Sequence, residues 1–275
     1  MRQGRTAFFW GLVLIFLLSL PIWAQPSKEA GVHVVDGQLY GPDRELLLLR
    51  GTNDSWQLCA FFNARGGYVG VSGTGPVEYS GRINTSDEYA MANYWYRYAR
   101  TLQALHPSLN FVRIGAHAAE GTGAIWTCYN ADRAHYDRVL SCMAEGFEAA
   151  GFYFVVTLSG FADMVAEPAN RPLLKSQTLP QQYVGRFPRY GGDPYNNILH
   201  IDSESFDNLC ELAAYTGDHL AGYSHFVGIE FCNEPDLHFY DSAYWRPVHG
   251  DNNNMNGSKH NAFKAWSARL ASKTK

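Results

Sequence analysis

Short apolar runs alternate with longer amphipathic segments from residue 32 onward. The runs at 32–40 and 45–51 are typical of strands, and the turn residues at 41–43 predict that they form a β-hairpin. The second run is apolar without alternation, as expected of a strand that is covered on both faces. Three later apolar runs predict further strands, at 110–116, 152–158 and 228–232.

Helical periodicity fills much of the chain between these runs. Four helices are predicted, at 88–105, 131–151, 202–220 and 259–273. Ser86 is suited to cap the first helix, Gly151 to end the second, and Asp202 or Ser203 to cap the third. The segments that lead from each strand to the next helix read as long loops, and the glycine-rich one before Ser86 has about 35 residues.

Strands that alternate with helices imply parallel pairing through right-handed crossovers. The strand-to-helix loops are long and the later helix-to-strand connections are short, which favours an α/β fold of the (β/α)8 TIM-barrel type. Only about the first four βα units are present, because a complete barrel with similar loops needs more than about 400 residues. A doubly wound nucleotide enzyme also has its site at strand ends, but neither of its usual glycine signatures follows a strand here.

The first 24 residues predict a secretory signal peptide. Arg2 and Arg5 precede an apolar run at 7–20, and cleavage is expected after Ala24. The alternative is an uncleaved membrane anchor, although the run is shorter than the roughly 20 residues that a spanning helix needs. The mature domain, 25–275, is therefore expected to be secreted, extracellular or periplasmic, without stable membrane association after cleavage.

Composition narrows the classes of partner. The net charge of −4 argues against a nucleic-acid partner, and the 15% aromatic content is compatible with sugar binding. The count of 5 cysteines leaves at least one thiol unpaired, and no Cys/His spacing suits a metal. We expect no metal and no cofactor.

Four motifs, LLLLRGTN, LNFVRIGA, YDRVLSCMAEGFEAAGFYFVVTL and GIEFCNEP, occur in an informative order along the chain. In order and spacing they resemble the first four units of glycoside hydrolase family five, which contains cellulases and β-mannanases. The resemblance covers roughly residues 32 to 275, and the N-E-P tripeptide at the end of the fourth strand is its most specific part. It implies a retaining enzyme that uses two glutamates.

The resemblance implies that Glu234 is the general acid/base and that Asn233 binds the sugar 2-hydroxyl beside the scissile bond. A retaining glycosidase needs one carboxylic acid to protonate the leaving oxygen and a second carboxylate to attack the sugar. The plainer interpretations are a helix-start carboxylate next to Pro235 for Glu234, and a turn-forming residue for Asn233.

Further substrate contacts are expected around these two residues. Arg113 matches the arginine that holds and ionises the nucleophile in the family, the alternative being a surface salt bridge. Glu230 is interpreted as a partner of charges or hydrogen bonds inside the barrel. Asn53 and Trp56 follow the first strand. Three aromatic residues in other loops are candidate sugar platforms, with ordinary packing as the alternative for each: Trp126, Tyr183 and Trp245.

Two features depart from the family pattern. The histidine or polar pair that usually follows the third strand is missing, and the nucleophile glutamate, which belongs to the seventh strand, lies outside the sequence. The predicted function is a secreted, endo-acting retaining β-glycanase that acts on β-1,4-mannan or β-glucan, with a polysaccharide or oligosaccharide as partner. The alternative is a non-catalytic carbohydrate-binding half-barrel, which would self-associate through its exposed barrel edges.

Overall fold

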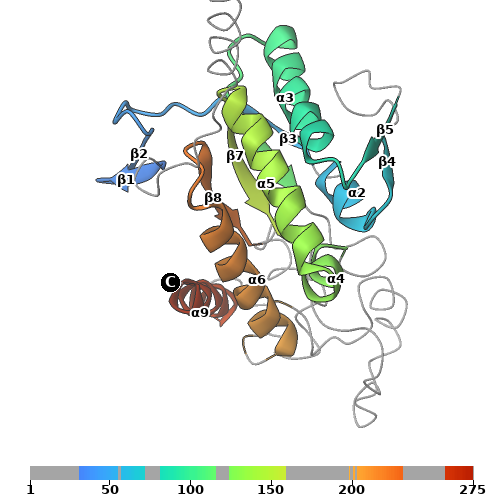
Figure 1. Cartoon of the computed structure of the whole chain (residues 1–275). Helices are drawn as coiled ribbons and strands as arrows, with labels where there is room; N and C mark the ends of the chain where they lie inside the picture. The colour runs from blue at the N-terminus through green and yellow to red at the C-terminus, as the bar shows by residue number, and fades with distance from the viewer. Residues whose placement is uncertain are drawn as a thin grey trace, which may run out of the picture.

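The computed structural model describes residues 31–54, 57–71, 81–115, 124–158, 198, 201, 203–231 and 258–274. Its centre is a parallel sheet in the order β3-β6-β7-β8 (Figure 1), whose strands are Gly51–Asp54, Phe111–Gly115, Tyr153–Thr157 and Phe226–Glu230. The spatial order equals the chain order, so every crossover proceeds in the same direction across the sheet. The chain therefore has an α/β fold with four consecutive parallel strands.

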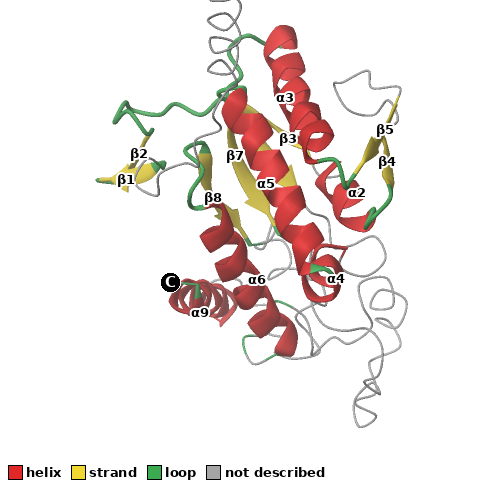
Figure 2. Ribbon diagram, in the orientation of Figure 1, coloured by secondary structure: helices red, strands yellow, loops and turns green. Residues whose placement is uncertain are grey.

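The helices that connect these strands cover one face of the sheet (Figure 2). They are α3 (Glu88–Leu105), α5 (Arg133–Ala149) and α6 (Glu204–Leu220), and α9 (Ser258–Lys273) packs on α6. The prediction that Ser86 caps α3 is wrong, because the carboxylate of Asp87 accepts the capping hydrogen bond from the backbone N–H of Ala90 at 2.9 Å. Ser203, one of the two predicted caps, caps α6 by accepting from Phe206 N at 3.0 Å.

The amino-terminal hairpin exists, but it lies entirely within the first apolar run. Strands β1 (His33–Val35) and β2 (Gln38–Tyr40) pair antiparallel around Asp36 and Gly37, whose φ angles are 50° and 77°. An Asp-Gly pair readily adopts these positive angles, which a two-residue hairpin turn requires. The predicted pairing of this run with 45–51 is found only in reduced form, as an antiparallel bridge between Tyr40 and Leu46 with the backbone N–H of Leu47 donating to Leu39 O at 2.9 Å.

Two of the segments expected to be loops contain regular structure. The segment after β3 includes α2 (Gln57–Asn63) and an antiparallel pair, β4 (Tyr68–Val71) and β5 (Gly81–Asn84). The segment after β6 includes α4 (Ala124–Ala131). Of these additional elements, α2 packs against β6, α4 packs against α2 and α5, and β5 packs against α3.

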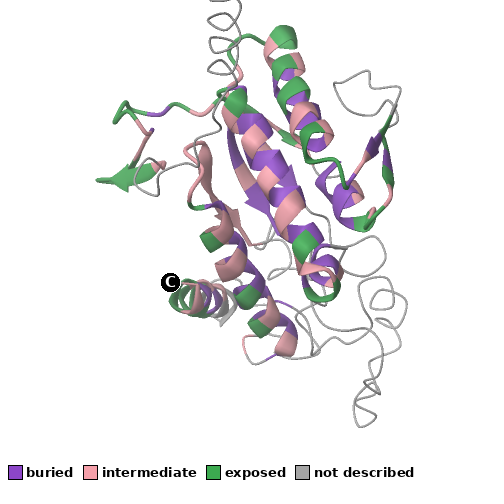
Figure 3. Ribbon diagram, viewed as in Figure 1, coloured by how far each residue is buried: buried purple, intermediate pink, exposed green. Residues whose placement is uncertain are grey.

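The hydrophobic core lies between the sheet and its helices (Figure 3). Alternate residues of the two central strands, Val112 and Ile114 in β6 and Phe154 and Val156 in β7, are fully buried on the helix side. Large aromatic rings from α3 and α5 fill the space above them; for example, the rings of Trp95 and Phe147 have centroids 5.6 Å apart. This core fixes the sheet, and the residues between these positions face the other side.

The end of α5 is tied to the start of β8 by a carboxylate. Glu148 accepts hydrogen bonds from the backbone N–H of Ser224 at 2.7 Å and from the Ser224 hydroxyl. Burial by itself would raise the pKa of Glu148, but hydrogen bonds from His225 and Ser224 outweigh it and leave the pKa below its ordinary value. The contact lies at the amino end of β8, away from the strand ends that carry the candidate site.

Candidate functional site

A polar network joins all four parallel strands on the sheet face opposite the helices. Its members are Asn53 of β3, Arg113 of β6, Thr157 of β7 and Glu230 of β8, and we call the face that bears them the polar face. Each residue lies at or near the carboxyl end of its strand, where parallel α/β proteins build their sites.

Arg113 is the centre of this network. Its Nη1 donates to Asn53 Oδ1 at 2.9 Å, and its Nε forms an ion pair with Glu230. The same Glu230 oxygen accepts the hydroxyl of Thr157 at 2.6 Å. The side chains of Arg113 and Glu230 remain 21% and 33% exposed, so solvent or a ligand reaches a guanidinium that is held in one orientation.

A β-bulge places Glu230 on the polar face. At the start of the pairing, Phe226 lies opposite Phe154, a residue of the helix side. The register then shifts, so that Gly228 lies opposite Val155 and Glu230 lies opposite Thr157. Because side chains alternate along a strand, a one-residue shift exchanges the faces, and without it Glu230 would face the helices. Gly228 has φ 154°, which L side chains rarely adopt, and this accounts for a glycine at the bulge.

A carboxylate at the end of β3 belongs to the helix side. The Asp54 side chain accepts the hydroxyl of Tyr98 at 2.6 Å and the backbone N–H of Gln57 at 3.3 Å. Burial, and then the nearby charge of Asp54, raises the pKa of the Tyr98 phenol. Asp54 thereby links β3 to α2 and α3.

The structure brings together two of the sequence-predicted site residues, Arg113 and Asn53, and gives Glu230 the charge partner expected of it. Trp126 is in α4 rather than in a loop, and it is buried with its ring centroid 5.4 Å from that of Tyr129, which favours the packing interpretation. The other predicted site residues lie outside the described residues: Glu234, Asn233, Trp56, Tyr183 and Trp245.

Sequence reasoning missed Thr157 and Gly228. Thr157 is the last residue of an otherwise apolar strand, β7, and it lies on the same face as Val155 because alternate residues share a face. A polar residue at the end of an apolar run was the signal that could have identified it. Gly228 was visible as a glycine inside a strand pattern, which indicates a bulge.

Several other kinds of site are not found in the described ranges. The cysteines Cys59, Cys128, Cys142 and Cys210 are buried there, and burial raises the pKa of the Cys142 thiol to about 12. Such thiols are poor nucleophiles at neutral pH. The same ranges contain no group of three His, Cys, Asp or Glu side chains placed to hold a metal, and no helix long and apolar enough to cross a membrane.

The fold and the polar network together define an α/β protein whose parallel strands follow one another in chain order and carry the network near their carboxyl ends. Comparisons of the chain with protein-family models, with curated proteins and with solved structures give no match. The resemblance to glycoside hydrolases therefore rests on the sequence motifs.

Proposed function

We propose that this chain contributes the first four βα units of a (β/α)8-barrel catalytic domain of a secreted retaining β-glycanase. Glu234 is its general acid/base. The observation that carries the proposal is the network of Asn53, Arg113, Thr157 and Glu230, which takes one residue from each parallel strand. In the sequence, Glu230 is four residues before Glu234.

The order of the strands also favours this class of enzyme. In a doubly wound nucleotide-binding sheet the strand order reverses at the ligand site and helices cover both faces. Here the order β3-β6-β7-β8 has no reversal, and α3, α5 and α6 lie on the same face (Figure 1). A sheet of this kind leaves its second face to line the inside of a barrel.

The proposed mechanism assigns a separate role to each residue. Glu234 protonates the leaving oxygen while a second carboxylate, about 5–5.5 Å away, attacks the sugar. Asn233 donates to the sugar 2-hydroxyl, an interaction that strengthens in the transition state. Arg113, fixed by Asn53 and Glu230, supplies a positive charge that keeps a neighbouring carboxylate ionised and nucleophilic. No residue of this sequence is assigned as the nucleophile, and the proposed substrate is a β-linked glycan, with β-1,4-mannan preferred to β-glucan.

The proposal is tested on the protein as its complete gene expresses and secretes it. We expect it to release reducing sugar from β-1,4-mannan and to retain the anomeric configuration in the first product, as followed by NMR. Glu234→Gln should lower kcat by about 10²–10⁴-fold, the contribution of a general acid/base. Azide, which needs no general base, should partly restore turnover of an aryl glycoside.

A matched control variant is Glu211→Gln. Glu211 lies on α6 and accepts the hydroxyl of Tyr129 at 2.8 Å, and a glutamine retains that acceptor. Its activity should equal that of the wild type. Unchanged kcat in Glu234→Gln, or a product of inverted configuration, would contradict the acid/base assignment. Sugar binding without any hydrolysis by the secreted protein would favour the non-catalytic alternative.

A further inference from the structure

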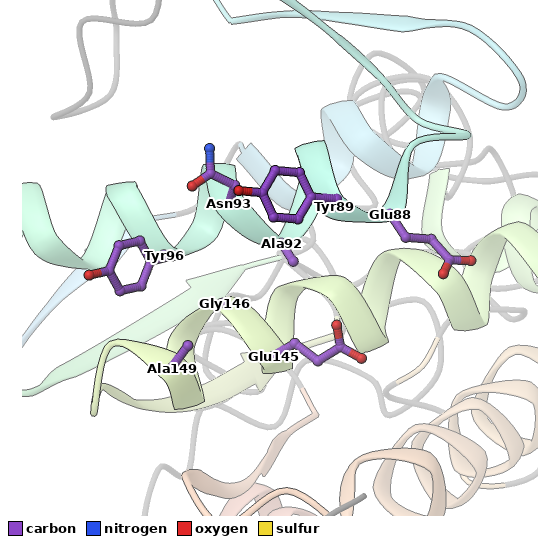
Figure 4. Close-up of a pocket in the computed structure, with 8 residues that line it drawn as sticks. All are labelled: Glu88, Tyr89, Ala92, Asn93, Tyr96, Glu145, Gly146 and Ala149. Atoms are coloured by element: carbon purple, nitrogen blue, oxygen red, sulfur yellow. The ribbon is translucent and has the colours of Figure 1, made fainter. Parts of the chain in front are cut away.

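A groove of about 360 Å³ lies between α3 and α5, outside the polar network (Figure 4). Small residues, Ala92 of α3 and Gly146 and Ala149 of α5, form its floor. The two helices approach closely there, since a Cβ atom added at Gly146 would lie 2.5 Å from the carbonyl oxygen of Ala92. The close approach leaves the larger side chains on both sides to form the walls.

Two tyrosines of α3 form the first wall. Tyr89 is 76% exposed and Tyr96 is 39% exposed. They are seven residues apart, so they lie on the same side of the helix at about 10.5 Å along its axis. Figure 4 shows both rings beside the groove, with Asn93 between them. Exposed aromatic faces of this kind attract cations through their quadrupole.

Carboxylates make one end of the groove acidic. Glu88 of α3 pairs with Arg138 at 3.4 Å, whereas no cation among the described residues pairs with Glu145 of α5. Burial, followed by the charges of Glu88 and Glu148, raises the pKa of Glu145. The groove thus combines aromatic rings with a carboxylate that lacks a balancing charge, and a cationic ligand would relieve this imbalance.

Elsewhere in the chain a guanidinium is held by tyrosine rings, and its Nε donates to the backbone carbonyl of Tyr129 at 2.9 Å. Arg133 lies over the ring of Tyr129 at 3.3 Å and over the ring of Tyr215 at 4.3 Å. Both phenols donate to carboxylates, Tyr129 to Glu211 and Tyr215 to Asp137, each at 2.8 Å. A planar guanidinium stacks on tyrosine and bonds carboxylates in a way that a lysine ammonium does not.

We propose that the groove between α3 and α5 binds an arginine side chain of a protein partner, with the guanidinium at Glu145 and against Tyr89. The aliphatic part of the arginine lies over the small residues of the floor. The proposal does not depend on the hydrolase function, because the groove lies in the helical layer and the polar network lies on the opposite face of the sheet.

The test uses the secreted protein and the peptide acetyl-Gly-Arg-Gly-amide as probe, with NMR titration to measure affinity. The matched probe carries citrulline, which has the shape of arginine without the charge. We expect the arginine peptide to bind at least about tenfold more tightly than the citrulline peptide. Equal affinity for the two peptides would overturn the proposal.

The affinities of variants for the arginine peptide test whether it binds in this groove. Glu145→Gln should weaken binding of the arginine peptide about tenfold, and Tyr89→Leu about two- to fivefold. The matched controls, Asp218→Asn and Tyr68→Leu, alter an exposed carboxylate and an exposed tyrosine elsewhere and should leave the affinity unchanged.

Full affinity in Glu145→Gln would refute the assignment. The assignment would also be refuted if the protein bound a mannan hexasaccharide but not the arginine peptide, and if Tyr89→Leu abolished that sugar binding. None of these measurements depends on hydrolysis, so the two proposals can fail separately.

Discussion

Gly146, in the middle of α5, provides a sharp test of the helix packing. A methyl group at this position would lie 2.5 Å from Ala92 O, 2.6 Å from Trp95 Cβ and 2.8 Å from Tyr96 N. All three atoms belong to the backbone or the first side-chain carbon of α3, so no rotamer change can move them away. Gly146→Ala therefore forces α3 and α5 apart by roughly 1 Å, and that gap forfeits part of the contact energy between them.

Two opposing effects set the magnitude. Overpacking of a core costs about 1–3 kcal/mol, and the upper end applies here because the obstructing atoms are rigid. Alanine in place of glycine in a helix gains about 1 kcal/mol. The net result is a loss of about 2 kcal/mol in the free energy of unfolding, which corresponds to a decrease in Tm of about 4–8 °C.

Gly217 in α6 is the matched control. The nearest atom to a Cβ there is Ile229 Cγ1, at 4.0 Å, which is an ordinary contact. Gly217→Ala should therefore gain up to about 1 kcal/mol from helix propensity alone. Urea unfolding followed by tryptophan fluorescence measures both variants. If Gly146→Ala is as stable as the wild type, or if both alanines destabilise equally, the close approach of α3 and α5 is incorrect.

Two further stability predictions concern hydrogen-bonded carboxylates. The pKa of Glu148 is below its ordinary value in the folded protein, so its stabilising contribution is present above about pH 4.5 and is lost as the pH falls further. Glu148→Gln should flatten the acid side of a plot of urea midpoint against pH, and identical slopes would contradict the assigned hydrogen bonds. Thr157→Val removes the hydroxyl that donates to Glu230 at 2.6 Å, and it should cost about 1 kcal/mol in urea unfolding because Glu230 is partly exposed. An unaltered midpoint in Thr157→Val would mean that this bond contributes nothing to the network.

The central strands and long helices could be predicted because their signals are local. The predicted strands at 110–116 and 152–158 correspond to β6 and β7, and the predicted helix at 88–105 corresponds to α3 with the same limits. Only the cap differed by one residue. Asp87 and Ser86 are both good caps, and which one is used depends on the φ and ψ angles of the turn before the helix.

The amino-terminal hairpin shows a different cause of error. The predicted hairpin turns at 41–43, whereas the structure turns at Asp36–Gly37, because a two-residue turn with positive φ angles fixes the pairing of its flanks directly. Leu46 and Leu48 are exposed, so apolarity alone did not identify a covered strand. Elements α2, β4 and β5 were missed because glycines on both sides of short apolar stretches read as loop.

The site could be predicted only in part. Arg113 and Asn53 were found through motifs, but their contact depends on the register Asn53↔Arg113 between strands that are separated by about 60 residues of chain. Sequence periodicity does not encode register between distant strands. The face on which Glu230 lies depends on the bulge at Gly228. Strict alternation along β8 would assign Glu230 to the wrong face.

Strand alternation makes the two faces of the sheet largely independent. In β6, Val112 and Ile114 pack in the core, while Arg113 belongs to the polar network on the other face. A substitution at Arg113 can therefore alter the chemistry of the network without opening a cavity in the core. Gly228 is the exception, because its bulge directs Ile229 toward the core and Glu230 toward Arg113 in a single step. A side chain at Gly228 that restores regular pairing would exchange these two residues, burying a carboxylate in the core and removing the network's anion. Stability and site chemistry are therefore coupled at this position in the sheet.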